Sequence, residues 1–296
     1  MDETLRRLQL EQLAMLELLD RFCRRHQIHY SLYAGTLLGA VRHGGFIPWD
    51  DDLDVCMPRA DYDRFLVLWD QEGYLLQNKD NTPAFTQSFT KLRKLGTTFL
   101  TPEDRGRGYH TGIFLDIFPV DRHPGGGFFL PQVMLYQLLV REFVPPAQPL
   151  PIRLTAGALL KLIPAGRREA LRRFLLGRIT ARRDPKLSRV TVETLDAARQ
   201  RYSPELMDRF VELPFEDGLF PCVADWDQLL RVKYGDYTQL PPPSERIWKH
   251  RPLVIDFDRE WEGRDAENQH HSGGLQRRRH PGGSPGFSDG ADPPGF

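Results

Sequence analysis

The sequence predicts an α/β (α+β) protein in which helices flank a small mixed sheet and an added helical segment follows the sheet core. Three observations predict this class. A long amphipathic helix pattern opens the chain, and short apolar strand patterns alternate with helical ones after it. The third observation is a long basic stretch of helical character in the middle of the chain.

Residues 3–26 form the first predicted element. Apolar residues recur at helical spacing, and charged residues occupy the other positions. The apolar positions are Leu5, Leu8, Leu13, Leu16, Leu19 and Cys23. We therefore expect a helix that packs on the core.

The next thirty residues predict a strand, a short helix and a second strand. Ile28 to Tyr33 fits a short strand, and Thr36 to Val41 fits a helix that the glycine pair 44–45 ends. The stretch "DLDVCM" at 52–57 alternates as a strand does.

Further elements are predicted in order along the chain. We expect a helix in "RADYDRFLVLWDQ", a strand or hairpin in 83–100 and an apolar strand in "IFLDIFPVD". After these we expect basic helices in 127–200, interrupted at 145–151, and then turns, a strand and a short helix in 213–242.

These patterns predict a single catalytic domain over residues 1–262. We divide it into a sheet core (1–125), a basic helical segment (126–205) and a C-terminal motif region (206–262). Residues 263–296 are rich in Gly, Pro and polar residues, so we expect them to be disordered.

Bulk composition points to no particular partner. Lys plus Arg and Asp plus Glu are 40 each, and the three cysteines are far apart in the sequence. Such spacing argues against a zinc site or a disulfide framework and predicts a reducing, cytoplasmic location. No stretch has the length and apolarity of a signal peptide or a transmembrane helix.

The stretch "GFIPWDDDLDV" places four aspartates within five positions. Side chains alternate along a strand, so Asp52 and Asp54 share a face, and Asp50 joins them if the strand begins early. Asp51 should point the other way. Neighbouring carboxylates repel unless a cation lies between them, and oxygen ligands favour Mg²⁺ or Mn²⁺. A solvated acidic turn is the alternative.

Two neighbouring features favour the metal site. The turn "AGTLLG" starts a helix whose free N–H groups suit a phosphate. Asp116 is a lone aspartate in an apolar strand, where a carboxylate is costly unless paired or bound to a metal. A glycine turn, an Asp-x-Asp pair and one further strand aspartate, in this order, are typical of nucleotidyltransferase catalytic sheets.

The combination of "YSLYAGTLLGAVRHGGFIPWDDDLDV", "FTKLRKLGTTF", "GIFLDIFPVD" and "YGDYTQLPP" resembles the LicD/fukutin family, over roughly residues 10 to 250. The resemblance implies a nucleotidyltransferase-type fold. It also implies transfer of phosphocholine or a polyol phosphate from a CDP-linked donor to a hydroxyl of a cell-surface glycan or glycolipid, as in lipopolysaccharide modification. Some animal members carry a zinc-binding cysteine loop, which this sequence lacks.

Carried over by position, the metal ligands are Asp52, Asp54 and Asp116, and the general base is Asp116 or Asp50. The expected substrate-binding residues are Gly35, Thr36, Gly39, Arg42, Lys91, Arg93, Tyr234 and Asp236. Arg42 is equally well explained as a cation at a helix C-terminus. His110 and His250 have weaker claims to a role.

Other functions stay open from the sequence. A true nucleotidyltransferase would use the same metal site to transfer an NMP. A catalytically inactive binding homologue is disfavoured because all three carboxylates are present. The acidic stretch also lacks the spacing of a calcium-binding loop.

The basic segment has two interpretations of equal weight. From Arg153 to Arg189 the chain has eleven Lys or Arg residues and two acids. These residues either lie on an anionic membrane surface, at the inner face of the membrane, or form a helical subdomain with solvated arginines. Nucleic acid is not expected as a partner, because stacking aromatics are sparse there.

Overall fold

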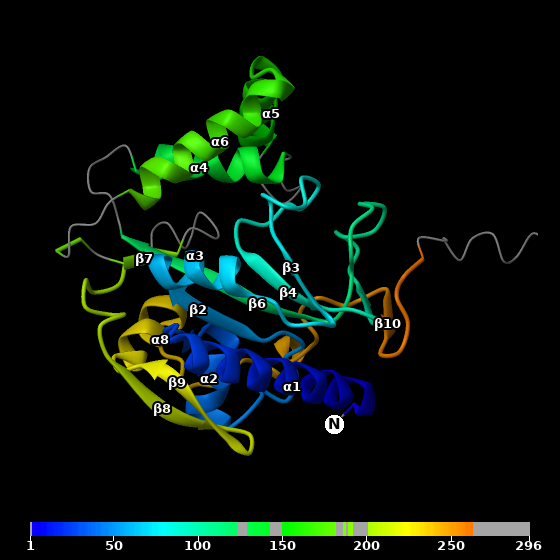
Figure 1. Cartoon of the computed structure of the whole chain (residues 1–296), viewed down its shortest axis with the longest axis vertical. Coiled ribbons are helices and arrows are strands. Elements are labelled where there is room, and N and C mark those ends of the chain that lie inside the picture. Colours follow the sequence, from blue (N-terminus) through cyan, green and yellow to red (C-terminus); the bar gives the residue numbers. More distant parts are fainter. Residues whose placement is uncertain are drawn as a thin grey trace, which may run out of the picture. The chain divides into compact units, whose positions relative to one another are not determined.

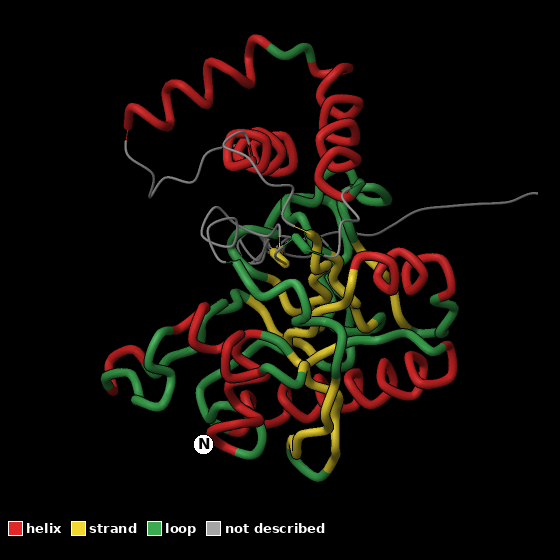
Figure 2. The backbone as a smooth tube through the Cα atoms, turned by 90° about the vertical axis from the view of Figure 1, so that its left-hand side faces the viewer, coloured by secondary structure: helices red, strands yellow, loops and turns green. Residues whose placement is uncertain are grey.

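A sheet of six strands lies between helices in the computed structural model (Figures 1 and 2). The structure describes residues 2–122, 129–142, 150–181, 186–187, 189–191 and 201–262. The order of strands is β1–β2–β6–β4–β3, and β7 pairs with β6 beside this path. Their bounds are β1 Ser31–Leu32, β2 Asp54–Pro58, β3 Tyr74–Gln77, β4 Thr90–Lys94, β6 Phe114–Arg122 and β7 Arg189–Thr191.

The sheet is mixed, as predicted. Its central pair, β2 and β6, is parallel, whereas β1 pairs with β2, β4 with β6 and β3 with β4 in antiparallel fashion. A parallel pair needs a crossover connection, and the chain between β2 and β6 supplies it with a helix and the β3 and β4 strands. The predicted α/β (α+β) class is confirmed.

Helices pack against the sheet. Helices α1 (Glu3–His26) and α3 (Arg59–Leu68) meet on it, with the Phe22 ring of α1 5.7 Å from the Phe65 ring of α3, and α2 (Ala34–His43) packs beside β2 (Figure 1). Helix α1 has the predicted bounds. The Asp2 side chain caps its start by accepting from the Thr4 N–H at 2.9 Å, and Gln27 ends it in a left-handed conformation.

Two predicted strand regions differ in extent or pairing. Of Ile28 to Tyr33, only Ser31 and Leu32 pair with β2, because the Ile28 N–H instead closes the end of α1 on the Cys23 carbonyl. Within 83–100, β4 and β5 (Thr98–Leu100) do not form a hairpin. Strand β5 pairs with β10 (Val254–Asp256), a partner remote in sequence.

The C-terminal region packs on the sheet core. A hairpin of β8 (Phe210–Phe215) and β9 (Gly218–Val223) precedes α8 (Trp226–Tyr234) and a short 3₁₀ helix, Pro243–Glu245. The hairpin's Glu216 accepts the Phe46 N–H at 3.0 Å and pairs with Arg6 at 2.6 Å. It therefore ties the start of the acidic stretch to α1.

The added helical segment has a hydrophobic cluster of its own. Helices α4 (Phe129–Arg141), α5 (Leu150–Leu162) and α6 (Ala165–Thr180) bury Val133, Tyr136, Leu139, Val140, Leu160, Leu175 and Ile179. The predicted helices are confirmed over these bounds, although the strand β7 also falls within 127–200.

Residues up to Trp261 form one compact unit. The internal divisions of the predicted catalytic domain stay a prediction. The tail predicted to be disordered, 263–296, lies outside the described residues. In the part of the chain that is described, no helix combines the length and apolarity needed to cross a membrane.

Candidate active site

Strands β2 and β6 bring two of the predicted aspartates side by side. Asp54 begins β2 and is the register partner of Asp116 in the parallel strand β6. The Asp116 N–H donates to the Leu53 carbonyl at 2.8 Å, so the ladder continues just ahead of β2. Asp54 and Asp116 are both at least 96% buried. The sequence pattern alone predicted this neighbourhood.

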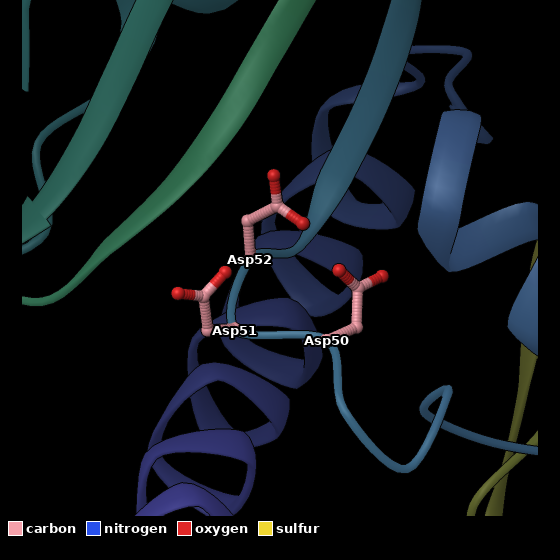
Figure 3. Close-up of side chains that lie close together, drawn as sticks. All are labelled: Asp50, Asp51 and Asp52. Atoms are coloured by element: carbon pink, nitrogen blue, oxygen red, sulfur yellow. The ribbon is translucent and has the colours of Figure 1, made fainter. Parts of the chain in front are cut away.

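The acidic stretch itself is not a strand before Asp54. Residues 50–53 lead into β2 as irregular chain, because the Asp50 N–H turns back to the Ile47 carbonyl. The strand predicted to begin at Asp52 begins at Asp54, and the early start that would have added Asp50 to its face does not occur. Figure 3 shows the carboxylates of Asp50, Asp51 and Asp52 close together on the segment that leads into β2.

Asp50 lies against the glycine turn. A Cβ atom at Gly35 would come within 2.5 Å of the Asp50 Oδ2 atom, so only glycine leaves room for this carboxyl group. Thr36 accepts the Asp54 N–H on its Oγ1 atom at 2.8 Å. The turn predicted to hold a phosphate therefore also shapes the acidic site.

Two lysines supply positive charge to the carboxylates. Lys91 on β4 is the register partner of Asp116 and donates to its Oδ1 and Oδ2 atoms at 2.7 and 2.9 Å. Lys249, from the segment after the 3₁₀ helix, donates to Asp52 Oδ2 at 2.8 Å. The Lys249 side chain is 65% exposed, although its ammonium group contacts a buried carboxylate. Lys91 was expected near the site, whereas Lys249 was not.

These charges separate the pKa values of the carboxyl groups. Burial raises the pKa of Asp52, but Lys249 and His250 outweigh it and hold that pKa below its usual range. Burial, followed by the charge of Asp52, raises the pKa values of Asp50 and Asp54 well above normal. Burial also raises the pKa of Asp116 despite Lys91. The raised pKa values mean that ionising all of these carboxyl groups together is costly, a cost that a bound divalent cation would offset.

The cluster with the closest carboxylates differs from the predicted ligand set. Oxygen atoms of Asp50, Asp51 and Asp52 lie within 4.8 Å of one another, the one such group of three among the described residues. Asp51, however, is fully buried and bound by His250. The donor set of hard oxygens fits Mg²⁺ or Mn²⁺, and the ligands Asp52, Asp54 and Asp116 stay a prediction.

Asp51, which was expected only to point away from Asp52 and Asp54, holds the segment that contains His250. Its Oδ2 atom accepts the His250 backbone N–H at 3.0 Å, and its Oδ1 atom lies 3.1 Å from His250 Nδ1. The His250 ring also stands edge-on to Phe114, with centroids 5.4 Å apart. This contact fixes Lys249, the preceding residue, beside Asp52.

We expect His250→Ala to lower the free energy of unfolding by about 2 kcal/mol, because a buried carboxylate loses a partner. Urea denaturation measures the change. The matched control is His29→Ala, whose imidazole is largely exposed beside Asp61 and should cost under about 0.5 kcal/mol. Equal losses in the two variants would contradict the anchoring role of His250.

Two buried glutamines of α1 bind backbone carbonyls of the acidic stretch. Gln9 donates to the Ile47 and Asp50 carbonyls at 3.3 and 3.0 Å, and Gln12 donates to the Asp51 and Phe114 carbonyls at 3.0 and 3.3 Å. The sequence analysis did not predict a role for these glutamines, although their positions in the helix pattern indicate one. They occupy buried positions on the apolar face of an amphipathic helix, where a polar side chain needs a partner.

The remaining predicted residues divide into two groups. Tyr234, at the end of α8, is 41% exposed, and burial of its hydroxyl followed by the charge of Asp54 raises its pKa, while its substrate contact stays a prediction. Arg93 is fully buried and donates to Gln77, Gly112 and Asp104.

Three others make contacts elsewhere. Arg42 donates to the Tyr237 and Gln239 carbonyls at 2.9 and 3.2 Å, which joins α2 to the motif after α8. Exposed Asp236 accepts from Thr238 and Gln239. A Cβ at Gly39 would lie 2.4 Å from the Gly45 carbonyl oxygen, so Gly39 permits a close backbone approach. The predicted substrate contacts of these residues stay predictions.

Comparison with known proteins agrees with this geometry. Residues 27–143 match the family model described as LicD/FKTN/FKRP, nucleotidyltransferase domain. That range begins ahead of β1 and includes β2, β4 and β6, the strands that carry Asp54, Lys91 and Asp116. The resemblance drawn from the motifs is confirmed.

Relatives of known sequence extend the match. The lipopolysaccharide cholinephosphotransferase LicD of Haemophilus influenzae is 28% identical over 254 residues, covering 81% of this chain and 94% of that protein. An uncharacterised protein of Rickettsia prowazekii is 30% identical over 109 residues, 36% of this chain and 37% of its own length. One of Rickettsia typhi is 42% identical over 57 residues, 18% of each chain.

Proposed function

Because residues 27–143 match the LicD/FKTN/FKRP nucleotidyltransferase family model, we propose that the chain is a metal-dependent phosphotransferase. It moves phosphocholine or a polyol phosphate from a CDP-linked donor to a hydroxyl of a cell-surface glycan or glycolipid. The observation that carries the proposal is the excess of buried carboxylates at β2 and β6, beside the cations of Lys91 and Lys249. The Haemophilus relative, named a lipopolysaccharide cholinephosphotransferase, supports the class of transfer.

Asp52, Asp54 and Asp116 would hold the cation. When bound, a divalent cation neutralises the charge of a diphosphate and of its leaving group. Lys249 also neutralises the negative charge of the donor. Its side chain is 65% exposed, so its ammonium group is free to move from Asp52 to a phosphate oxygen.

Proton transfer falls to Asp50. Burial and the charge of Asp52 raise its pKa, which makes the ionised carboxylate a stronger base, and unlike Asp116 it is not held by a lysine on both oxygens. The acceptor oxygen bonds to the phosphorus that carries the alcohol, the bond from this phosphorus to CMP breaks, and the hydroxyl proton passes to an Asp50 carboxylate oxygen. We assign Tyr234 to orienting the donor, since the charges of Asp54, Asp50 and Asp52 act on its hydroxyl.

Product analysis tests the proposal. CDP-choline, CDP-glycerol and CDP-ribitol labelled in the nucleotide are incubated with the protein, Mg²⁺ and a glycan extract. We expect release of labelled CMP that depends on the extract. Label in the glycan would instead establish nucleotidyl transfer. Binding of a donor without turnover would establish an inactive binding homologue.

We expect Mg²⁺ to stabilise the protein in the absence of any substrate. Ligand binding to the native state adds about 2.7 kcal/mol at a hundred times Kd, which raises Tm. Since Asp50 and Asp54 hold their protons above the ordinary carboxyl range, the gain should grow as pH rises and these groups ionise. Thermal unfolding with Mg²⁺ or EDTA across pH measures it.

The matched pair for this measurement is Asp54→Asn and Asp63→Asn. Asp54→Asn removes a proposed ligand and should abolish the Mg²⁺-dependent rise in Tm. Asp63 is an exposed aspartate of α3, so its substitution should leave the rise unchanged. A rise that survives in Asp54→Asn would place the cation elsewhere.

A further inference from the structure

Helix α5 exposes most of its apolar surface. Leu150, Leu154 and Leu162 recur with Ala158 every four residues, so they lie along one side of the helix. Leu154 is 64% exposed and Leu162 is 78% exposed. Among the α5 side chains that the structure describes, Leu160 belongs to the buried cluster of the helical segment. An apolar stripe of this kind is expected to be covered by something.

The charges around this stripe are positive. Arg153, Lys161 and Arg167 are exposed, and in the described chain from Leu150 to Arg168 there is no Asp or Glu. None of the three cations has an ion pair within the described residues. The apolar stripe and its cationic rim have the composition of a helix that lies in a membrane interface.

The arginines further along α6 differ. Arg172 pairs with Glu169 and Asp80, and Arg173 pairs with Glu169 at 2.5 Å. Arg168 donates to the Leu160 and Ile163 carbonyls, which closes the α5–α6 turn. These three cations are therefore used within the fold, unlike Arg153, Lys161 and Arg167 beside the exposed leucines of α5; Arg178, near the end of α6, lies over the Phe174 ring.

We propose that α5 and the start of α6 dock on the surface of an anionic lipid bilayer. The leucines of α5 enter the boundary between head groups and acyl chains, while Arg153, Lys161 and Arg167 contact lipid phosphates. With thirteen residues, α5 is too short to span the hydrocarbon core and lies parallel to it. The inference does not rest on the proposed chemistry, because no step of binding requires the carboxylate site.

Co-sedimentation of the full chain with vesicles tests the proposal. The vesicles are pure phosphatidylcholine or contain about one third phosphatidylglycerol. We expect binding to the anionic vesicles that weakens with salt, and little binding to the neutral ones. Failure to bind anionic vesicles at low salt would overturn the proposal and leave the CMP-release assay unaffected.

Substitutions on α5 test whether its exposed leucines and cations form the lipid-binding surface. Leu154→Glu with Leu162→Glu should weaken vesicle binding at least about tenfold. Val67→Glu, on an 83% exposed position of α3, should leave it unchanged. Arg153→Gln and Lys161→Gln should each weaken binding about fivefold, whereas Arg21→Gln on α1, a 64% exposed side chain, should not.

Two outcomes contradict the proposal. The first is equal vesicle binding by the α5 variants and their controls, with circular dichroism verifying that all are folded. The second is self-association without lipid, seen by sedimentation velocity and abolished by the leucine substitutions. In that case a second copy of the chain, and not a bilayer, covers α5.

Discussion

Asp54→Asn will lower turnover about a thousandfold or more while the protein stays folded. The buried Asp54 carboxylate is surrounded by Asp52 and Asp116, and its raised pKa records their repulsion. If this repulsion is the driving force for cation capture, the neutral amide removes several kcal/mol of transition-state stabilisation. The rate of CMP release from the active donor at saturating Mg²⁺ measures the loss.

A measurement of stability distinguishes loss of the metal ligand from misfolding of the Asp54→Asn variant. Asparagine matches aspartate in size and carries no charge, so the metal-free variant should unfold at the same or a higher urea concentration than the unaltered protein. Asp63→Asn on α3 should change neither turnover nor stability. Full turnover in Asp54→Asn would remove Asp54 from the active site.

The second large effect is on stability. Lys91→Met should lower the free energy of unfolding by about 3–5 kcal/mol in EDTA, because it leaves Asp116 buried without its counter-charge. The Lys91 ammonium also lies 3.3 Å from the centroid of the Phe114 ring, a contact that methionine partly replaces. Urea denaturation gives the value.

A double-mutant cycle assigns this effect to the pair. Asp116→Asn combined with Lys91→Met should cost about 1–3 kcal/mol less than the sum of the single losses. Adding Mg²⁺ should recover part of the loss in Lys91→Met, since the cation replaces the missing charge beside Asp116. Additive single effects, or no recovery with Mg²⁺, would mean that Lys91 and Asp116 act separately.

Local pattern was sufficient for much of the fold. The helix of residues 3–26 was predicted to the residue, because its periodicity and its cap are both encoded within a few positions. The same holds for the strand that carries Asp116, an apolar run with one costly carboxylate. Adjacent placement of Asp54 and Asp116 followed from the motif order, and the register of β2 and β6 agrees.

Pairing between distant segments was not predictable in this way. The β5–β10 pair joins residues about 98–100 to 254–256, and no local signal in the 83–100 stretch distinguishes this partner from β4. Lys249 and His250 reach Asp52 and Asp51 across 197 and 199 residues of chain. Such contacts depend on how packed elements meet, which spacing within one segment does not record.

The sequence by itself determined the class of fold, the aspartates near β2 and β6, and the glycine turn beside them, because alternation and helical periodicity are local properties of the chain. The tertiary structure decided how these charges are balanced. It separated Asp51, held by His250, from Asp50, which presses on Gly35, and it brought Lys249 to Asp52. Charge balance in a buried site depends on every group that folding brings within a few ångströms, whatever its distance along the chain.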